Sequence, residues 1–201
     1  MIKEKLGNAK KQIKIATIRR SLENKNFTLI SQNCIGGVFY HDMKLQFQSP
    51  TINLFFNADD FVRFVSNLDY YINNAILSVE TGERYPIGFL DDIAIHFMHY
   101  RSISEAENAW LRRIERIQWD RIVVCSTDRD GFNKQTFEEW KKIPYPKVLF
   151  TSNPVFGSEA DSVFFEEYER LGCVPDLIPG REFYKDSVLL RTVNRLGQDN
   201  R

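Results

Sequence analysis

Asp128 and Asp130, two carboxylates two positions apart, carry the sharpest chemical signal in the sequence. They stand in "DRDG", directly after the apolar run "RIVVC". Carboxylate oxygens are preferred ligands of Mg²⁺ and Mn²⁺, and Arg129 between them can neutralise phosphate charge. Glycosyltransferases that use nucleotide sugars carry such a pair, so the spacing predicts a divalent cation on Asp128 and Asp130. The alternative is a structural loop with an Asx turn, in which Gly131 supplies a positive φ.

Three apolar runs each end in a small polar cluster. "FTLI" leads into "SQNCIGG", "RIVV" into "CSTDRDG" and "KVLF" into "TSNP". Ligands of open α/β sheets bind outside the carboxyl ends of the strands. If the three runs are parallel neighbours, their clusters share one edge of the sheet. We therefore predict a ligand site built from Asn33, Gly36, Gly37, Arg129, Ser152 and Asn153.

Gly36 and Gly37 stand where a strand passes into a predicted helix. Glycines at a helix start let backbone N–H groups approach a phosphate or a carboxylate. Neither GxGxxG nor the Walker pattern is present. Tight packing of the helix on the strand is the alternative explanation for the pair.

His96 and His99 in "DDIAIHFMHY" invite a metal site, but strand geometry argues against it. Side chains three apart on a strand face opposite sides, so the two imidazoles do not converge. Either one can act as a general base if it reaches the ligand edge. We predict His96 and Asp128 as catalytic residues. A half-buried polar side chain at a strand end is the alternative for each histidine.

Three cysteines, Cys34, Cys125 and Cys173, cannot all pair within one chain, and none forms a CxxC motif. A reducing cytoplasm is the simplest interpretation. A nucleophilic cysteine needs a base and an electropositive setting, and the sequence shows no Cys-His signature. A hydrolase or acyl transferase using Cys34 or Ser126 ranks last among the possible functions, because no GxSxG elbow is present.

Predicted strands and helices alternate through most of the chain. The sequence predicts strands at 26–31, 121–125 and 147–150, and a strand or strand pair at 89–100. It predicts helices beginning at Ile35 and covering 57–77, 102–117, 133–143, 161–172 and 186–197. This alternation predicts an α/β fold with three layers: a mostly parallel, Rossmann-like sheet with helices on both faces.

Residues 1–25 differ in composition from the rest and predict a basic helical arm ahead of a single α/β domain, 26–201. They hold eight Lys or Arg and two Glu, a net charge of +6, whereas the whole chain is neutral. Ile2, Leu6, Ala9, Ile13 and Ala16 share one helical face. The arm either packs on its own domain or on a second subunit, or makes peripheral contact with a membrane.

Overall composition limits the function classes. A formal net charge of zero gives no indication of a nucleic-acid partner. No apolar stretch approaches the roughly 20 residues of a transmembrane helix, and the basic N-terminus lacks the apolar region of a secretion signal. These features predict a cytoplasmic protein, and oligomer formation stays open.

Long motifs resemble a bacterial family of unknown function whose members are often named exopolysaccharide or capsular polysaccharide biosynthesis proteins. The resemblance lies in "FTLISQNCIGGVFYHDMKLQFQSPTINLFF", in "YPIGFLDDIAIHFMHYRSISEAENAWLRRIERIQWDRIVVCSTDRDG" and in "KVLFTS". It covers residues 26–190 and implies a fold and a role in polysaccharide synthesis. It carries no established catalytic residues to this chain.

Two functions follow as expectations. The first is a transferase or processing enzyme acting on a sugar-nucleotide or a glycan, with Mg²⁺ or Mn²⁺ as the possible cofactor. The second is a non-catalytic module that binds a glycan or a partner in a polysaccharide assembly, which suits the 16 Phe, 8 Tyr and 3 Trp.

Overall fold

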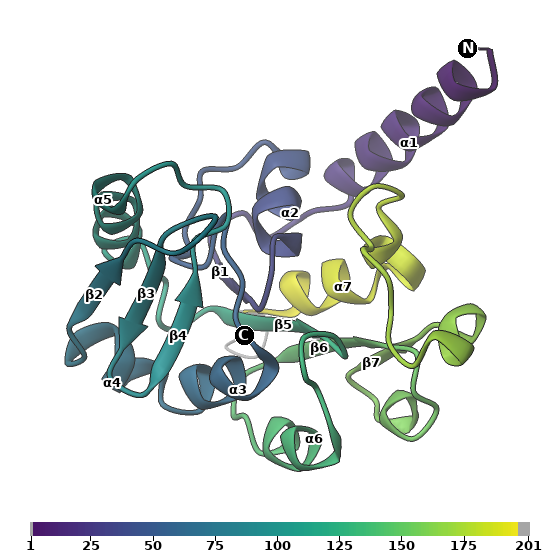
Figure 1. Ribbon diagram of the computed structural model, residues 1–201. Coiled ribbons are helices and arrows are strands. Elements are labelled where there is room, and N and C mark those ends of the chain that lie inside the picture. Colours follow the sequence, from purple (N-terminus) through teal and green to yellow (C-terminus); the bar gives the residue numbers. More distant parts are fainter. Residues whose placement is uncertain (1, 197–201) are drawn as a thin grey trace.

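A four-stranded parallel sheet forms the centre of the protein (Figure 1). The computed structural model describes residues 2–196, with side chains from residue 7 onward. The strand order is β1 (Thr28–Ser31), β5 (Ile122–Thr127), β6 (Lys147–Thr151) and β7 (Ser162–Phe164). Every residue of β1 and β5 is buried, as expected for strands covered on both faces. All three pairings in this sheet are parallel.

Helices α2 (Ile35–Met43) and α7 (Val188–Arg195) cover one face of the sheet. Leu29, Val123 and Val148 project from successive strands into this layer and are fully buried there. The same core takes in apolar residues from the end of α1 (Ile2–Arg20) and from the segment before α7, which contains the short 3₁₀ stretch η3 (Glu182–Ser187).

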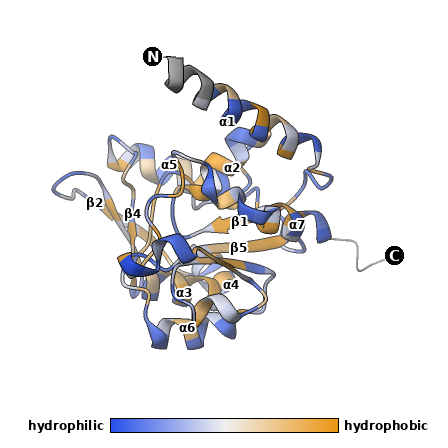
Figure 2. Ribbon diagram, turned by 90° about the vertical axis from the view of Figure 1, so that its right-hand side faces the viewer, coloured by the Kyte–Doolittle hydropathy of each residue, from blue (hydrophilic) through white to orange (hydrophobic). Residues whose placement is uncertain are grey.

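The opposite face of the parallel sheet is covered by a larger part of the chain. Helices α3 (Ala58–Ser66), α4 (Leu68–Asn73), α5 (Ile103–Ile114) and α6 (Lys134–Lys141) lie there, with a second sheet beside them. That sheet is antiparallel, in the order β2 (Leu77–Glu80), β3 (Ile87–Leu90) and β4 (Ile93–His96). Ile30, Val124 and Leu149 point into this layer from the parallel sheet. Figure 2 shows hydrophobic residues on the strands of the central sheet.

The structure confirms an α/β fold with a parallel main sheet. The small antiparallel sheet was predicted in part: the strand or strand pair predicted at 89–100 overlaps β3 and β4, whereas β2 was not predicted. The narrower, Rossmann-like assignment stays a prediction.

Two helix predictions were wrong. Residues 161–172 form strand β7 and the 3₁₀ stretch η2 (Glu166–Leu171), after another short turn, η1 (Phe156–Ser158). Val163 and Phe165 are buried while the residue between them is partly exposed, which is the alternation of a strand that finds a partner in β6. The predicted helix at 57–77 breaks between α3 and α4 at Asn67, and Ile76 is 83% exposed.

Local geometry explains where two other elements begin or end. The hydroxyl of Ser102 accepts a hydrogen bond from the backbone N–H of Glu105 at 3.2 Å, which caps α5. Gly172 has φ +78° and ends η2, the conformation that glycine adopts at least cost. Gly197, the predicted stop of the last helix, lies outside the described residues.

The N-terminal segment is helical as predicted, and the apolar residues that pack on the domain lie outside the set predicted to share one face. Ile13 is 66% exposed, whereas Ile15, Ile18 and Leu22 are buried against the domain. Contact with the core beside α2 therefore selects the face of α1 that carries Ile15, Ile18 and Leu22. The first turns of α1 extend beyond the body of the molecule (Figure 1). The division into an arm, 1–25, and a domain, 26–201, stays a prediction.

Among the described residues, no helix combines the length and the apolar character that crossing a membrane requires.

Candidate functional site

The three polar clusters meet at the carboxyl edge of the parallel sheet. Asn33, just after β1, donates a hydrogen bond from its side-chain amide to the hydroxyl of Thr127 at the end of β5, at 3.2 Å. Asp128, the next residue after β5, accepts a hydrogen bond from the backbone N–H of Ser152, just after β6, at 2.7 Å. Strand order and hydrogen bonds thus place the segments after β1, β5 and β6 side by side, as the strand pattern predicted.

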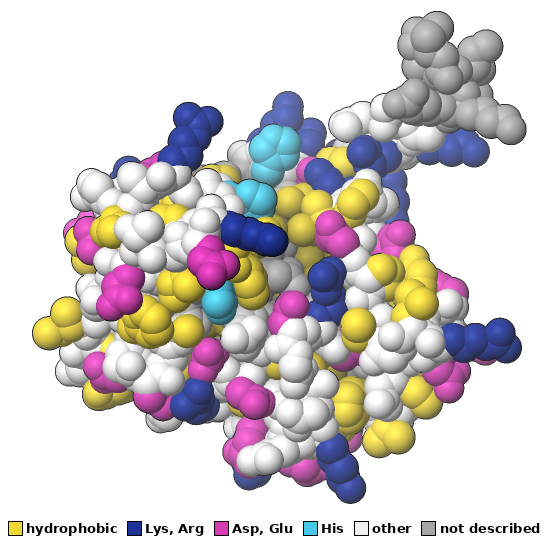
Figure 3. All heavy atoms as spheres, in the orientation of Figure 1, with side chains coloured by type: hydrophobic (Ala, Val, Ile, Leu, Met, Phe, Trp, Pro, Cys, Tyr) yellow, Lys and Arg dark blue, Asp and Glu magenta, His cyan; other side chains and the backbone are white. Residues whose placement is uncertain are grey.

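A cavity of about 590 Å³ opens at this edge. Its polar lining includes Asn33, Thr127, Arg129, Asp130 and His99. Its apolar lining comes from the loop before α3, from the chain after β4 and from the segment 175–178, and includes Phe55, Met98, Leu177 and Ile178. In the view of Figure 3, hydrophobic and charged side chains surround a hollow near the middle of the molecule. The volume falls within the range of about 300–1,000 Å³ typical of small-molecule sites.

Arg129 is the most informative residue of the cavity. Its side chain is partly buried, and its guanidinium makes no hydrogen bond or ion pair within the part of the chain that the structure describes. A guanidinium presents five donors and is always charged, so withdrawing it from water without a partner costs free energy. The lining therefore contains a positive charge without a hydrogen-bonded or ion-paired partner among the described residues, with the carboxylates of Asp130 and Asp176 in the same lining.

Gly36 and Gly37 serve packing in this structure. A Cβ on Gly36 would lie 2.8 Å from the Cβ of Ser31, and one on Gly37 would lie 3.3 Å from a methyl carbon of Ile52. Both glycines are buried: Gly36 lets α2 lie close against β1, and Gly37 lets it lie close against the segment that carries Ile52. The start of α2 nevertheless borders the cavity, through Cys34 and Ile35.

Asp128 is buried, and both of its oxygens are already occupied. Oδ1 accepts a hydrogen bond from the backbone N–H of Val174 at 2.8 Å. Oδ2 accepts from the backbone N–H of Ser152 at 2.7 Å and from the hydroxyl of Thr151 at 2.8 Å. This arrangement makes Asp128 a structural junction, and a cation or a catalytic role there would require these bonds to be broken.

Ser152 and Asn153 do not line the 590 Å³ cavity and lie on the other side of the loop that follows β5. Ser152 is buried beside Asp128, and the side-chain oxygen of Asn153 accepts a hydrogen bond from the backbone N–H of Val155 at 2.9 Å. Asn153 and Asp128 line a smaller cavity of about 400 Å³. The structure therefore separates two of the predicted ligand residues from Asn33 and Arg129.

Asp130 and Gly131 turn the loop, with φ of 56° and +89°. Partial removal of water raises the pKa of Asp130, and the nearby charges of Arg129 and His96 oppose that shift. The backbone carbonyl oxygen of Asp130 accepts a hydrogen bond from the backbone N–H of Ala58, which fixes the start of α3. Across residues 2–196, no group of three or more His, Cys, Asp and Glu side chains is arranged to hold a metal ion. A Mg²⁺ or Mn²⁺ ion on Asp128 and Asp130 stays a prediction.

The two histidines have different surroundings, but strand alternation does not explain this, because β4 ends at His96 and His99 lies in the turn that follows. His96 stacks on Phe55 with ring centroids 4.4 Å apart, and both imidazole nitrogens are buried without a hydrogen-bond partner among the described residues. Burial lowers the pKa of His96, and Asp60 and Asp130 oppose this shift. His99 lies beyond the end of β4 and lines the cavity directly. The structure thus places His99, and not His96, in contact with the cavity.

The thiols are poor nucleophiles in this structure. Burial, together with the charge of Asp176, raises the pKa of Cys34 to about 11. Burial raises the pKa of Cys125 to about 12. A thiol attacks as its thiolate, so neither residue is activated near neutral pH.

The sequence interpretation missed the apolar side of the cavity. Phe55 and Met98 come from a loop and a strand end that are joined by a bridge between Phe55 and His96. Leu177 and Ile178 come from "VPDLIPG", whose two prolines are the one local signal of an ordered loop.

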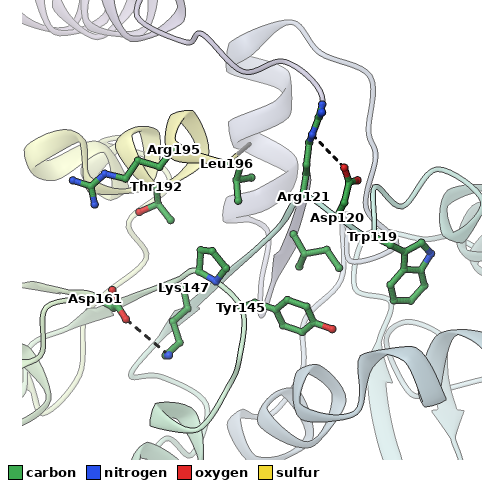
Figure 4. Close-up of a pocket in the computed structure, with 11 residues that line it drawn as sticks. Trp119, Asp120, Arg121, Tyr145, Lys147, Asp161, Thr192, Arg195 and Leu196 are labelled. Atoms are coloured by element: carbon green, nitrogen blue, oxygen red, sulfur yellow. Dashed lines mark ion pairs between the residues drawn. The ribbon is translucent and has the colours of Figure 1, made fainter. Parts of the chain in front are cut away.

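A second cavity of about 550 Å³ lies at the amino edge of the sheet, where β5 and β6 begin (Figure 4). Its lining includes Trp119, Tyr145 and Arg195. Lys147 pairs with Asp161 at 3.9 Å, which supplies this cavity with a neutralising charge of its own. It contains none of the predicted site residues and adjoins Leu196, the last described residue. We therefore take the carboxyl-edge cavity as the candidate site.

The fold and the cavity define an open α/β domain with a ligand-sized cavity at the carboxyl edge of its parallel sheet. The chain belongs to the family described as "Domain of unknown function (DUF1919)", whose model matches residues 5–193. It is also similar to a protein of Haemophilus influenzae that carries the name "Uncharacterized protein". The two are 34% identical over 174 residues, which cover 84% of this chain and 84% of the relative.

Proposed function

We propose that the carboxyl-edge cavity binds a nucleotide sugar or another phosphorylated sugar, and that the protein acts on it as a transferase in the synthesis of cell-surface polysaccharide. The observation that carries the proposal is the unpartnered guanidinium of Arg129 in a cavity of about 590 Å³. The role in polysaccharide synthesis is supported by the resemblance of the long sequence motifs, and not by the cavity. A cytoplasmic location accompanies the proposal.

The lining matches such a ligand in two respects. A phosphate oxygen pair can accept parallel hydrogen bonds from one guanidinium, and the start of α2 beside the cavity adds a weak positive potential. Phe55, Met98 and Leu177 offer an apolar surface to a base or a sugar ring. The ligand is therefore expected to be anionic at one end and weakly polar at the other.

A non-catalytic binding module is the second candidate. Its support is that the side chains available for chemistry are occupied or withdrawn: both oxygens of Asp128 are hydrogen-bonded, the nitrogens of His96 are buried, and the pKa of Cys34 is raised to about 11. His99, Asp130 and Asp176 remain as the titratable side chains that line the cavity with Arg129. Turnover of a bound nucleotide sugar would favour the transferase, and binding without turnover would favour the module.

Isothermal titration with UDP, UDP-glucose and GDP-mannose tests the proposal. We expect measurable binding of at least one of them by the wild-type protein. Arg129→Gln should weaken that binding at least tenfold, because a charge-assisted contact contributes about 1.5–3 kcal/mol. Arg121→Gln is the matched control, because Arg121 lines the amino-edge cavity and lies beside Asp120. Flat titrations with all three ligands, or equal affinity in the two variants, would contradict the proposal.

A further inference from the structure

The loop from Asp128 to Gly131 separates two cavities. Thr127, Arg129 and Asp130 line the larger one, of about 590 Å³. Asp128 lines the smaller one, of about 400 Å³, together with Phe132 and Lys134 beyond the loop. The two left-handed residues, Asp130 and Gly131, turn the chain between the two linings. One loop therefore forms a shared wall between two concave surfaces at the same edge of the sheet.

The polar groups left over in the smaller cavity are donors. The acceptor oxygens are used within the protein: Asp128 is saturated, and the side-chain oxygens of Asn133 and Asn153 accept backbone N–H groups of the chain that follows them. The ammonium of Lys134 makes no hydrogen bond within the described part of the chain, although Lys134 is exposed and its charge also acts on Glu138 one turn along α6. The side-chain amide nitrogen of Asn153 makes no hydrogen bond in this part of the chain either. Such a lining favours a ligand that supplies acceptors and a negative charge.

The base of the smaller cavity is apolar. Phe132 is partly buried and meets Phe156 edge to face, with ring centroids 5.6 Å apart. Val155 beside them is 68% exposed. An exposed apolar surface bordered by donors suits the C–H face of a sugar ring that carries a carboxylate.

We propose that the smaller cavity binds an acidic sugar residue of a glycan chain, with its carboxylate on Lys134 and Asn153 and its ring against Phe132. The inference rests on the proposed function and adds its second substrate. The larger cavity holds the phosphorylated sugar, and the smaller one holds the chain that lies next to it across the loop. Because the donors are distinct from Arg129, the two ligands bind to separable groups.

Titration of the ¹⁵N-labelled full chain with a hyaluronan tetrasaccharide, whose glucuronates supply the carboxylate, tests the proposal. Chitotetraose is the neutral probe of equal length. We expect the hyaluronan tetrasaccharide to shift the amide signals around Phe132, Lys134 and Asn153, and chitotetraose to bind at least fivefold more weakly.

Lys134→Gln should weaken binding of the hyaluronan tetrasaccharide at least fivefold. Lys142→Gln is the matched control, because it removes the same charge just past the far end of α6, where Lys142 pairs with Glu139. Arg129→Gln should leave this binding unchanged while it weakens UDP binding.

Two different failures are distinguishable. Absence of hyaluronan binding in a protein that binds UDP, or equal binding of the two tetrasaccharides, would overturn the acidic-sugar site and leave the proposed function standing. Absence of UDP binding in a protein that binds the hyaluronan tetrasaccharide through Lys134 would instead remove the proposed function and keep the glycan site.

Discussion

The carboxylate of Asp128 accepts a hydrogen bond from the backbone N–H of Val174 at 2.8 Å, although 46 positions separate the two residues. This bond fastens the loop after β5 to the segment that supplies Leu177 and Ile178 to the cavity. Asp128, which the sequence predicts as a metal ligand, therefore holds together the segments that form the cavity.

Replacing Asp128 should destabilise the protein before it affects any ligand. Asp128→Ala leaves the backbone N–H groups of Ser152 and Val174 buried without an acceptor, and each such loss costs about 1–3 kcal/mol. We expect the free energy of unfolding to fall by about 3 kcal/mol, measured by urea denaturation with an unchanged slope against urea.

Asp161→Ala is the control for the loss of a carboxylate, because Asp161 is exposed and pairs with Lys147 only at 3.9 Å. It should change stability by less than about 1 kcal/mol. A stable Asp128→Asn protein that lost only a Mn²⁺-dependent activity would contradict the structural role and support the metal prediction.

The strands and their polar ends could be predicted because they depend on local sequence. "FTLI", "RIVV" and "KVLF" are short apolar runs that a sheet buried on both faces requires, and parallel pairing then brings Asn33 and Thr127 together. The strand at 162–164 was missed because the helical spacing of the residues after it outweighed a three-residue alternation. Its identity depends on pairing with β6.

The apolar half of the cavity could not be predicted, since it depends on contacts between distant segments. Phe55 reaches the edge because it pairs with His96 across a long insertion. Nothing in "TINLFF" or "IAIHFMHY" alone specifies that bridge. The sequence also does not show whether a side chain already has hydrogen-bond partners. The motif "DRDG" is the same whether the oxygens of Asp128 are free or accept hydrogen bonds within the protein.

Gly36→Ala tests whether the glycine pair serves packing. The added methyl group would lie 2.8 Å from the Cβ of Ser31, and overpacking of this kind typically costs about 1–3 kcal/mol. Stability should fall by that amount in urea denaturation, while UDP affinity of the folded protein stays within twofold of the wild type.

Gly7→Ala is the matched control, because Gly7 is an exposed helical glycine with open space around it. It should stabilise the helix by about 0.5–1 kcal/mol. Unchanged stability of Gly36→Ala together with loss of UDP binding would instead indicate that the glycine approaches the ligand.

His96 should make stability fall in mild acid. Its pKa in the folded protein is below the ordinary value of 6.5, because both nitrogens are buried without partners. As the pH drops below about 6.5, His96 becomes protonated in the unfolded chain while it stays neutral in the folded protein. The free energy of unfolding therefore decreases until the pH reaches the lower pKa of the folded state.

Urea denaturation at pH 7.5 and pH 5.5, in the wild type and in His96→Leu, measures the contribution of His96 to the pH dependence of the free energy of unfolding. The loss of stability between the two pH values should be smaller in the variant. Both proteins retain His41 and His99, so the difference between them isolates His96. An equal loss in the two proteins would show that the imidazole finds a partner or reaches solvent.

The ion pair between Asp42 and Arg181 should control both stability and ligand affinity. Asp42 is 3% exposed and accepts hydrogen bonds from two guanidinium nitrogens of Arg181, at 2.6 and 3.2 Å, and from the hydroxyl of Tyr184 at 3.1 Å. Removing one partner of a buried pair leaves an uncompensated charge, which costs about 3–5 kcal/mol. Arg181→Met should therefore destabilise the protein by about 3 kcal/mol, since Tyr184 remains.

The double variant Asp42→Asn with Arg181→Met removes the charge as well as its partner, so it should be more stable than Arg181→Met alone. A double-mutant cycle in urea should give a coupling energy of about 1–3 kcal/mol. Because the pair ties α2 to the segment that carries Leu177 and Ile178, Arg181→Met should also weaken UDP binding, and the double variant should restore part of it. Additive losses of stability, or full UDP affinity in Arg181→Met, would show that this segment is held by its apolar contacts instead.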